Sequence, residues 1–228
     1  MIKAIIFDYD GVIVDSLEQA VEKDNLMFAL YGKSLRVNAD MIRAVWGEGW
    51  RKLYTNLMGF SEDEIIEASA VRKELGHSVR FPDVFPGMPE VLQTLAARFS
   101  LYIISSSDAD NIHQVLKSHN LDQYIARIFG QNTLGDVYKP NPEYLLRPLA
   151  EEGLSVGEAL SIGDSVDDLQ MSQAAGVSVI ACTWGWQEYK DLEREKPEAL
   201  ARSPQELLNA INHLTAPPSS SAVKNSYV

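Results

Sequence analysis

Two aspartates, Asp8 and Asp10, follow directly after an apolar run at residues 4–7 and precede Gly11. A short apolar run that ends in a turn residue predicts a buried strand, and ligand sites of open α/β sheets lie beyond the carboxyl ends of such strands. Neighbouring carboxylates repel each other unless a cation or a proton lies between them. The pair therefore indicates an oxygen-ligand site for a hard cation such as Mg2+. An ordinary acidic turn is the alternative for this stretch taken alone.

Further polar groups follow two other apolar runs and one loop. The run at residues 101–104 ends in Ser105, and the amides that start the next helix offer a phosphate cradle. The run at residues 159–162 leads to Asp164. In the sequence between these two runs, Lys139 comes directly before a stiff Pro-Asn-Pro. Because these groups recur in order at the same ends of successive parallel strands, we predict that they converge on one crevice.

Each of these groups also has a simpler interpretation. The serines at residues 105–107 could cap the following helix. Lys139 could be a solvated loop lysine. Asp167 and Asp168 could be acidic residues favoured in the first turn of a helix. None of these interpretations explains the ordered recurrence.

The elements that must position these residues alternate between strands and helices. This alternation predicts an α/β fold with a doubly wound parallel sheet covered on both faces. We assign residues 1–15 and 82–214 to this core. The strands are expected at residues 4–7, 101–104, 125–129, 159–162 and 177–182, and the helices at residues 88–98, 110–119, 143–152 and 167–175.

Residues 16–81 show helical patterns alone and predict an inserted α-helical unit. Helices are expected at residues 16–31, 38–46, 49–58 and 61–79. Ser16 can cap the first of them, and Ser61 with Glu64 forms a capping box for the last. Residues 215–228 are rich in proline and serine and are expected to be a disordered tail.

Composition excludes several classes of partner. The 228 residues include 32 acidic and 20 basic ones, so the formal charge is −12. This charge argues against binding to nucleic acid and against docking on an anionic membrane. The single cysteine, Cys182, cannot form an intrachain disulfide and fits a reducing compartment. Since no signal peptide and no apolar run of membrane-spanning length are seen, we expect a cytoplasmic protein.

Four ordered motifs resemble those of the haloacid dehalogenase superfamily of hydrolases. They are Asp8-Tyr9-Asp10-Gly11-Val12, the strand that ends in Ser105, Lys139-Pro140, and Gly163-Asp164 through Asp168. The likeness covers about residues 1–214, and the helical insertion resembles a C1-type α-helical cap. Val12 departs from the more common threonine, with little effect expected because this position mostly contributes its backbone N–H.

The resemblance implies a role for each motif residue. Asp8 would be the nucleophile and Asp10 the general acid and base. Mg2+ would be held by Asp8, the backbone carbonyl of Asp10, and Asp164. The phosphoryl oxygens would be bound by Ser105, Ser106 and Lys139. Asp168 would orient Lys139 or metal-bound water, with Asp167 as a weaker candidate.

Within the superfamily the chain looks most like the phosphoglycolate phosphatase and β-phosphoglucomutase group. The stretches that carry this likeness are residues 14–16, 86–92, 184–186 and 197–207. The expected function is a Mg2+-dependent phosphatase acting on a small phosphorylated metabolite, with phosphoglycolate as the first candidate. The alternative is a β-phosphoglucomutase-like phosphomutase on a sugar phosphate. A monomer or homodimer is expected.

Specificity is expected to lie in the cap, at Trp46, Arg51 and Lys52, where a cation could pair with a second anionic group of the substrate. Surface cations beside packing tryptophans are the alternative. A phosphonatase would need a Schiff-base lysine, for which Lys52 is an unsupported candidate. A dehalogenase needs no second aspartate. A binding protein on an inactive scaffold is disfavoured because the complete motif set is present.

Overall fold

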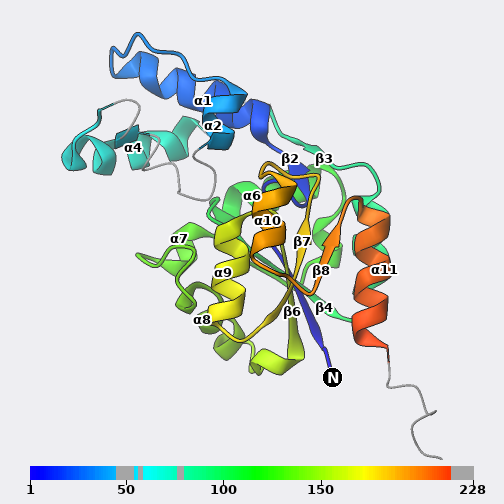
Figure 1. Cartoon of the computed structure of the whole chain (residues 1–228). Helices are drawn as coiled ribbons and strands as arrows, with labels where there is room; N and C mark the ends of the chain where they lie inside the picture. Colours follow the sequence, from blue (N-terminus) through cyan, green and yellow to red (C-terminus); the bar gives the residue numbers. More distant parts are fainter. Residues whose placement is uncertain (45–53, 56–58, 76–79, 217–228) are drawn as a thin grey trace, which may run out of the picture.

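The computed structural model describes residues 1–44, 54–55, 59–75 and 80–216. Two groups of elements are seen in Figure 1: a sheet flanked by helices, and a set of helices that lies beyond one end of the sheet. We call the second group, formed by α1 (Leu17–Leu30), α2 (Ala39–Ala44) and α4 (Glu62–Leu75), the helical unit.

In the described part of the chain, a sheet of six parallel strands has the order β5-β4-β1-β6-β7-β8. β1 is the first strand in sequence, yet it lies in the interior of the sheet between β4 and β6. The order of strands therefore reverses beside β1, which is where α/β sheets open a crevice. The strands are β1 (Ala4–Phe7), β4 (Ser100–Ile104), β5 (Arg127–Phe129), β6 (Ala159–Gly163), β7 (Ser178–Cys182) and β8 (Ala199–Ala201).

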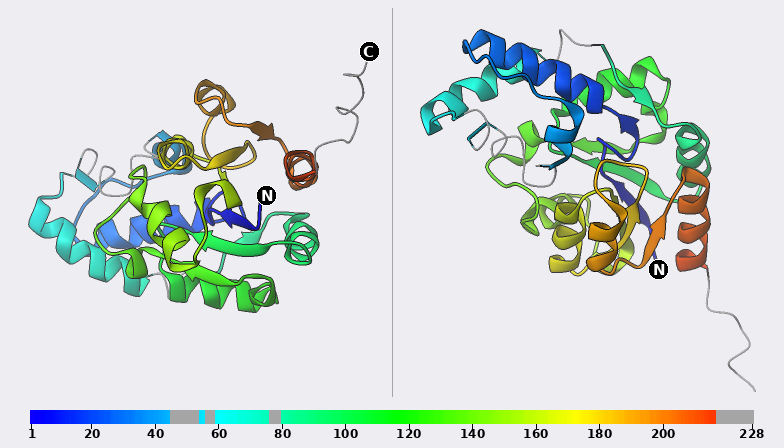
Figure 2. Two further views of the ribbon diagram at one scale, coloured as in Figure 1. Left: turned by 90° about the horizontal axis from the view of Figure 1, so that it is seen from below. Right: turned by 45° about the horizontal axis from the view of Figure 1, so that its top comes forward.

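Helices cover both faces of this sheet (Figure 2). Alternate residues of β1 face opposite ways, so Ile5 and Phe7 join one core cluster and Ala4 and Ile6 join another. The first cluster is closed by α5 (Met88–Ala96), α6 (Ala109–Ser118) and α11 (Pro204–Thr215). The opposite face is covered by α8 (Glu143–Glu151), α9 (Val166–Ala174) and α10 (Tyr189–Arg194). Between β5 and α8 lies the short helix α7 (Gln131–Leu134).

The helical unit is built around an apolar cluster that also includes Trp186 from the loop after β7. Phe28 of α1 packs edge-on against Tyr54 with ring centroids 5.0 Å apart, and Phe60 lies 5.2 Å from the same tyrosine ring. Two chain segments connect the unit to the sheet. They pair as the antiparallel strands β2 (Val14–Asp15) and β3 (Asp83–Val84).

The predicted parallel sheet with helices on both faces is confirmed, and most predicted elements begin and end within two residues of the observed ones. The capping box before α4 is also present, since the amide of Ser61 donates to Glu64 and the amide of Glu64 donates to the Ser61 hydroxyl. The prediction that Ser16 caps α1 is wrong, because its side chain makes no capping hydrogen bond. The predicted helix at residues 49–58 lies mostly outside the described residues.

The final part of the sheet domain was not predicted as secondary structure. α10, β8 and α11 follow β7, and β8 extends the sheet by one strand. Cys182 is fully buried at the end of β7, as expected of a structural thiol. Over the ranges that the structure describes, none of the helices combines the length and apolar character needed to cross a bilayer.

Candidate active site

Polar side chains gather beyond the carboxyl ends of β1, β4 and β6. Asp8 follows β1, Ser105 follows β4, and Asp164 follows β6. In the sheet register Phe7 lies opposite both Ile103 and Ile162, so the three strands end at nearly the same level. The structure therefore brings together residues that are up to 156 positions apart in the sequence, from Asp8 to Asp164.

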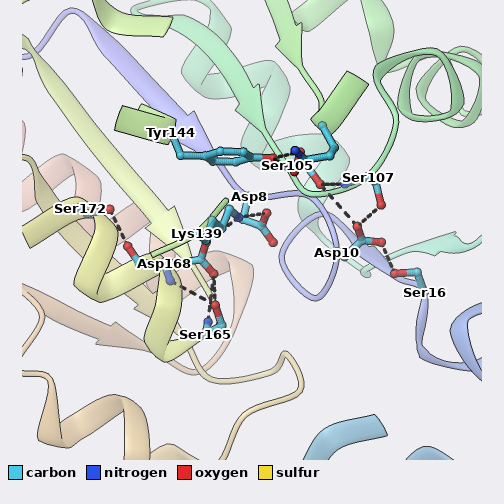
Figure 3. A network of polar contacts seen from close by, with 11 residues as sticks. Asp8, Asp10, Ser16, Ser105, Ser107, Lys139, Tyr144, Ser165, Asp168 and Ser172 are labelled. Carbon is cyan, nitrogen blue, oxygen red and sulfur yellow. Dashed lines mark hydrogen bonds and ion pairs between the residues drawn. The ribbon is translucent and has the colours of Figure 1, made fainter. Parts of the chain in front are cut away.

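Lys139 joins two of the predicted site carboxylates (Figure 3). Its Nζ lies 2.5 Å from Oδ1 of Asp8 and 2.6 Å from Oδ1 of Asp168. All three side chains are at most 9% exposed. Burial alone would lower the pKa of Lys139, but the carboxylates of Asp168 and Asp8 outweigh it and raise the pKa, so the ammonium form persists.

Asp168 is held in place by the residue that caps its own helix. The amide and the hydroxyl of Ser165 both donate to Oδ2 of Asp168, at 3.2 and 2.5 Å. In return, the amide of Asp168 donates to the Ser165 hydroxyl at 3.2 Å. One carboxylate oxygen thus closes the capping box of α9 and the other is directed at Lys139. Asp168 therefore contacts Lys139 and is also an acidic residue in the first turn of its helix, so the two interpretations made from the sequence hold together.

Asp164 is fully buried at the end of β6. Its Oδ2 accepts a hydrogen bond of 2.9 Å from the amide of Trp186. Two glycines allow this close approach, because an added Cβ would lie 2.1 Å from Oδ2 at Gly11 and 2.3 Å from it at Gly185. Oδ1 has no hydrogen-bond partner among the described residues. A buried carboxylate oxygen without a donor is a free ligand position for a cation.

The acidic cluster fits a cation. Carboxylate oxygens of Asp8, Asp164 and Asp168 lie within 4.8 Å of one another. Burial raises the pKa of Asp8 to about 7 although Lys139 works in the opposite direction, and burial together with Asp8 raises the pKa of Asp164 well above its usual value. Burial is the main cause of both pKa shifts, and repulsion between the neighbouring carboxylates adds to it, while Lys139 offsets only part of the negative charge. A divalent cation held by oxygen ligands would offset the rest of that charge.

Asp10 is surrounded by hydroxyl groups rather than by the lysine. Ser16 donates to its Oδ1 at 2.5 Å, and Ser107 donates to its Oδ2 at 2.6 Å. The Ser105 hydroxyl lies 3.5 Å from Oδ2, at the limit of a hydrogen bond. The Ser16 contact explains why this side chain does not cap α1. The helix after β4 is capped by Asp108, so the alternative that residues 105–107 serve as its cap is also wrong.

The predicted phosphate-binding serines differ in their surroundings. Ser105 is 1% exposed and its hydroxyl accepts a hydrogen bond of 3.0 Å from the amide of Ser107. Ser106 is exposed at the start of the same turn. The predicted specificity residues Trp46, Arg51 and Lys52 lie outside the described residues.

Three side chains that contact the site carboxylates were not predicted from the sequence to do so, namely Ser16, Ser107 and Ser165. Serines at strand ends and helix starts are common, so the residue type alone gives no signal. The order Ser-x-x-Asp at residues 165–168 does match a capping box and could have identified Ser165.

A cavity of about 460 Å³ opens between the helical unit and the loop at residues 184–186. Asp15, Arg43 and Trp184 are among the residues that line it. None of the clustered carboxylates lines this cavity, although Gly185 and Trp186, which do line it, also lie against Asp164.

Comparison with known proteins agrees with this geometry. The model of the haloacid dehalogenase-like hydrolase family matches residues 5–182. A phosphoglycolate phosphatase from Synechococcus elongatus is 26% identical over 214 residues, covering 93% of this chain and 98% of that protein. A phosphoglycolate phosphatase from Vibrio parahaemolyticus is 26% identical over 227 residues, covering 92% of this chain and 96% of that protein.

Solved structures share the fold. A haloacid dehalogenase-like family hydrolase from Streptococcus pneumoniae superposes with a TM-score of 0.78 at 24% identity, covering 92% of this chain and 98% of that one. A superfamily hydrolase from Geobacter sulfurreducens gives a TM-score of 0.69 at 25% identity, covering 92% and 99%. Because the family model spans most of the chain, from within β1 to the end of β7, this protein belongs to the haloacid dehalogenase-like hydrolases.

Proposed function

We propose that this protein is a Mg2+-dependent phosphatase that hydrolyses a small phosphorylated metabolite through an aspartyl phosphate on Asp8. The observation that carries the proposal is the contact of Lys139 with both Asp8 and Asp168, since it places a permanent cation beside the nucleophile. The phosphoglycolate phosphatases that match nearly the whole chain support the same reaction class.

In the first step, a carboxylate oxygen of Asp8 attacks phosphorus and forms a P–O bond. The bond between phosphorus and the oxygen of the leaving alcohol breaks, and Asp10 gives its proton to that oxygen. The hydroxyls of Ser16 and Ser107 hold the Asp10 carboxyl in a fixed orientation beside the site. Since Asp10 follows Asp8 by two residues, both groups can serve one phosphoryl group.

In the second step, water attacks the phosphorus of the aspartyl phosphate. Asp10, now a carboxylate, takes a proton from that water, and the bond between phosphorus and the Asp8 oxygen breaks. Inorganic phosphate leaves, Asp8 returns as a carboxylate, and Asp10 is protonated for the next cycle. The same aspartate therefore acts as acid and then as base.

The remaining groups offset the charge of the phosphoryl oxygens. Ser105 and Lys139 would bind them directly, and Asp168 keeps Lys139 directed at Asp8. Mg2+, when bound by Asp8, Asp164 and the backbone carbonyl of Asp10, supplies positive charge that shields Asp8 from the incoming phosphate. The unpartnered Oδ1 of Asp164 supports this ligand set.

Phosphoglycolate is our first candidate substrate, because relatives covering nearly this whole chain bear that name. The helical unit would close over the leaving group and exclude water. Arg51 and Lys52 remain the proposed partners of the substrate carboxylate and Trp46 a further proposed specificity residue, all three outside the described residues.

Phosphate release from a panel of phosphorylated metabolites tests the proposal. Each compound is incubated with Mg2+ or with EDTA, beside an Asp8→Asn variant. Asp15→Asn is the matched control, because it makes the same isosteric change at an exposed aspartate outside the acidic cluster. We expect Mg2+-dependent release with wild type and Asp15→Asn, and none with Asp8→Asn or EDTA.

The outcome also separates the related activities. Release concentrated on a small phosphorylated acid supports the phosphatase and identifies its substrate class. Conversion of one sugar phosphate into its isomer, with little phosphate released, would replace the phosphatase by a phosphomutase. Equal release by wild type and Asp8→Asn would rule out the covalent mechanism.

A further inference from the structure

Tyr144 lies in α8, and its hydroxyl points towards Ser105 of the proposed phosphate site (Figure 3). Its ring is fully buried in the core between the sheet and α8. Its hydroxyl lies 2.7 Å from the backbone oxygen of Ser105 and 3.1 Å from Oε1 of Gln131. The hydroxyl has one proton for two acceptors. The shorter contact, to Ser105, is therefore the main hydrogen bond, and Gln131 Oε1 shares the same proton.

The orientation of the Gln131 side-chain amide is set by the hydrogen bonds of its NH2 group. Its Nε2 donates to the backbone oxygens of Gly135 and Val137, at 2.5 and 3.2 Å. Both of these acceptors require the NH2 group, so Oε1 must face Tyr144. Val137 is two residues before Lys139. The tyrosine hydroxyl is therefore connected on one side to Ser105 and on the other to the loop that carries Lys139.

The two loops that the hydroxyl joins are already in close backbone contact. The amide of Ser105 donates to Phe129, and the amide of Gln131 donates to the backbone oxygen of Ser107, both at 3.0 Å. At Gly130 an added Cβ would lie 2.3 Å from the amide nitrogen of Ala109. In such tightly packed surroundings, a small shift of one loop moves the other.

The hydroxyl itself is not needed to fill the core. A phenylalanine ring would occupy the same space, but it would leave the Ser105 oxygen and Gln131 Oε1 without their shared donor. Burial raises the pKa of Tyr144 to about 12, although the nearby Lys139 works in the opposite direction, so the group remains a protonated donor at neutral pH. A buried hydroxyl that is dispensable for packing and well placed for orientation points to a role in the site.

We propose that the Tyr144 hydroxyl is a positioning group that sets Ser105 and Lys139 at the correct separation for one phosphoryl group. This inference rests on the proposed function, and it adds a residue that touches neither substrate nor cation. If it is correct, loss of the hydroxyl lowers the affinity for phosphate while the stability of the fold changes little.

Tyr144→Phe tests this, with Tyr102→Phe as a matched control. The Tyr102 hydroxyl donates to Glu152 at 3.0 Å, and its ring packs in the same core cluster away from the phosphate site. Binding of inorganic phosphate in the presence of Mg2+ is measured by calorimetry, together with kcat, KM and the unfolding midpoint. We expect Tyr144→Phe to weaken phosphate binding and to lower kcat/KM by about tenfold each, and Tyr102→Phe to change both less than about twofold.

Gln131→Leu removes the acceptor that links the Tyr144 hydroxyl to the Lys139 loop. It provides a second test should Tyr144→Phe fail to fold. We expect the same loss of phosphate affinity, and a double variant no worse than either single one, because both remove one chain of contacts. Unchanged phosphate affinity in a folded variant would overturn the inference and leave Tyr144 a core residue. Wild type that neither binds phosphate nor releases it from any substrate would instead overturn the proposed function, and this inference with it.

Discussion

The hydroxyl of Ser16 donates a hydrogen bond of 2.5 Å to Oδ1 of Asp10. Ser16 is the last residue before α1, and therefore the point at which the chain enters the helical unit. The proposed acid–base group is thus held directly by the connection between the sheet and the helical unit.

Replacement of Ser16 by alanine should impair catalysis more than folding. Asp10 keeps the Ser107 hydroxyl but loses one of its two short hydrogen bonds. A hydrogen bond to a charged group contributes roughly 1.5–3 kcal/mol, and about 1.4 kcal/mol corresponds to tenfold in rate. We expect Ser16→Ala to lower kcat by about tenfold, measured as phosphate release at saturating substrate.

The control is Ser118→Ala. Its hydroxyl donates to the backbone oxygen of Val115 at 2.7 Å, at the far end of α6. This variant removes a comparable partly buried hydrogen bond and should keep full activity. Equal rates for wild type and Ser16→Ala would show that the Ser16 hydroxyl does not contribute to the chemistry.

The stability of the metal-free protein should fall as pH rises towards neutrality. The pKa of Asp8 is raised from 3.8 to about 7 by burial, and that of Asp164 is raised as well. A carboxyl with a higher pKa in the folded state binds its proton more tightly when folded, so the stability it contributes is present at low pH. It is lost as pH rises between about 4 and 7. We expect a loss on the order of a few kcal/mol in EDTA, measured by chemical unfolding.

Mg2+ should reverse this loss, and more so at pH 8 than at pH 5, because it binds the carboxylate forms. Asp164→Asn distinguishes the contribution of the acidic cluster to this pH dependence from that of the many other titrating groups, since it removes one buried charge. Its unfolding free energy in EDTA should depend less steeply on pH, and Mg2+ should stabilise it little. A pH profile parallel to that of wild type would contradict the assignment of the effect to this cluster.

Removal of the Tyr9 hydroxyl should be harmless or stabilising. Tyr9 is 3% exposed, and over the described residues its hydroxyl has no hydrogen-bond partner. A buried polar group without a partner costs about 1–3 kcal/mol. We expect Tyr9→Phe to raise the free energy of unfolding by up to about 1 kcal/mol and to keep activity.

The comparison is Tyr54→Phe. Tyr54 is also fully buried, but its hydroxyl donates to Asp24 at 2.9 Å. The same substitution there should cost about 1–3 kcal/mol, because it leaves a buried carboxylate with one donor fewer. A loss of stability in Tyr9→Phe as large as that in Tyr54→Phe would mean that the Tyr9 hydroxyl is satisfied in solution.

The strands that carry the site were predictable because each is a short apolar run that stops at a polar residue. Asp8, Ser105 and Asp164 could therefore be placed at one end of the sheet without a structure. Lys139 could be grouped with them only from its place in the order of the motifs and from the resemblance, since a lysine in a loop has no periodic pattern. Its contacts with Asp8 and Asp168 join residues 131 and 29 positions away, and such distances leave no local signal.

The hydroxyl groups around Asp10 could not have been predicted. Ser16 has the type and place of a helix cap, and the preference of serine for such positions points to that role. In the fold, the Ser16 hydroxyl donates to the Asp10 carboxyl group at 2.5 Å and makes no capping hydrogen bond. This tertiary contact overrides the local preference of serine for helix caps. It depends on where the fold places Asp10, which the residues around Ser16 do not reveal.

Adding one methyl group at Gly185 should disturb the proposed cation site. An ideal Cβ at this position would lie 2.3 Å from Oδ2 and 2.4 Å from Cβ of Asp164. Asp164 is fully buried and holds the Trp186 amide at 2.9 Å, so it cannot move without breaking that contact. We expect Gly185→Ala to cost roughly 1–3 kcal/mol of stability through overpacking. The concentration of Mg2+ at half-maximal activity should rise by about tenfold or more, the change that a loss of about 1.4 kcal/mol in binding produces.

Gly157→Ala is the control for an added methyl group. Nothing lies within 4 Å of a Cβ there, and the backbone is not in the left-handed region. It should keep the stability and the Mg2+ dependence of wild type. Calorimetric titration with Mg2+ measures the affinity without turnover, so a catalytic defect cannot imitate the result. If Gly185→Ala binds Mg2+ as tightly as Gly157→Ala, then Asp164 is not a ligand, and the cation must be held by the remaining carboxylates of the acidic cluster.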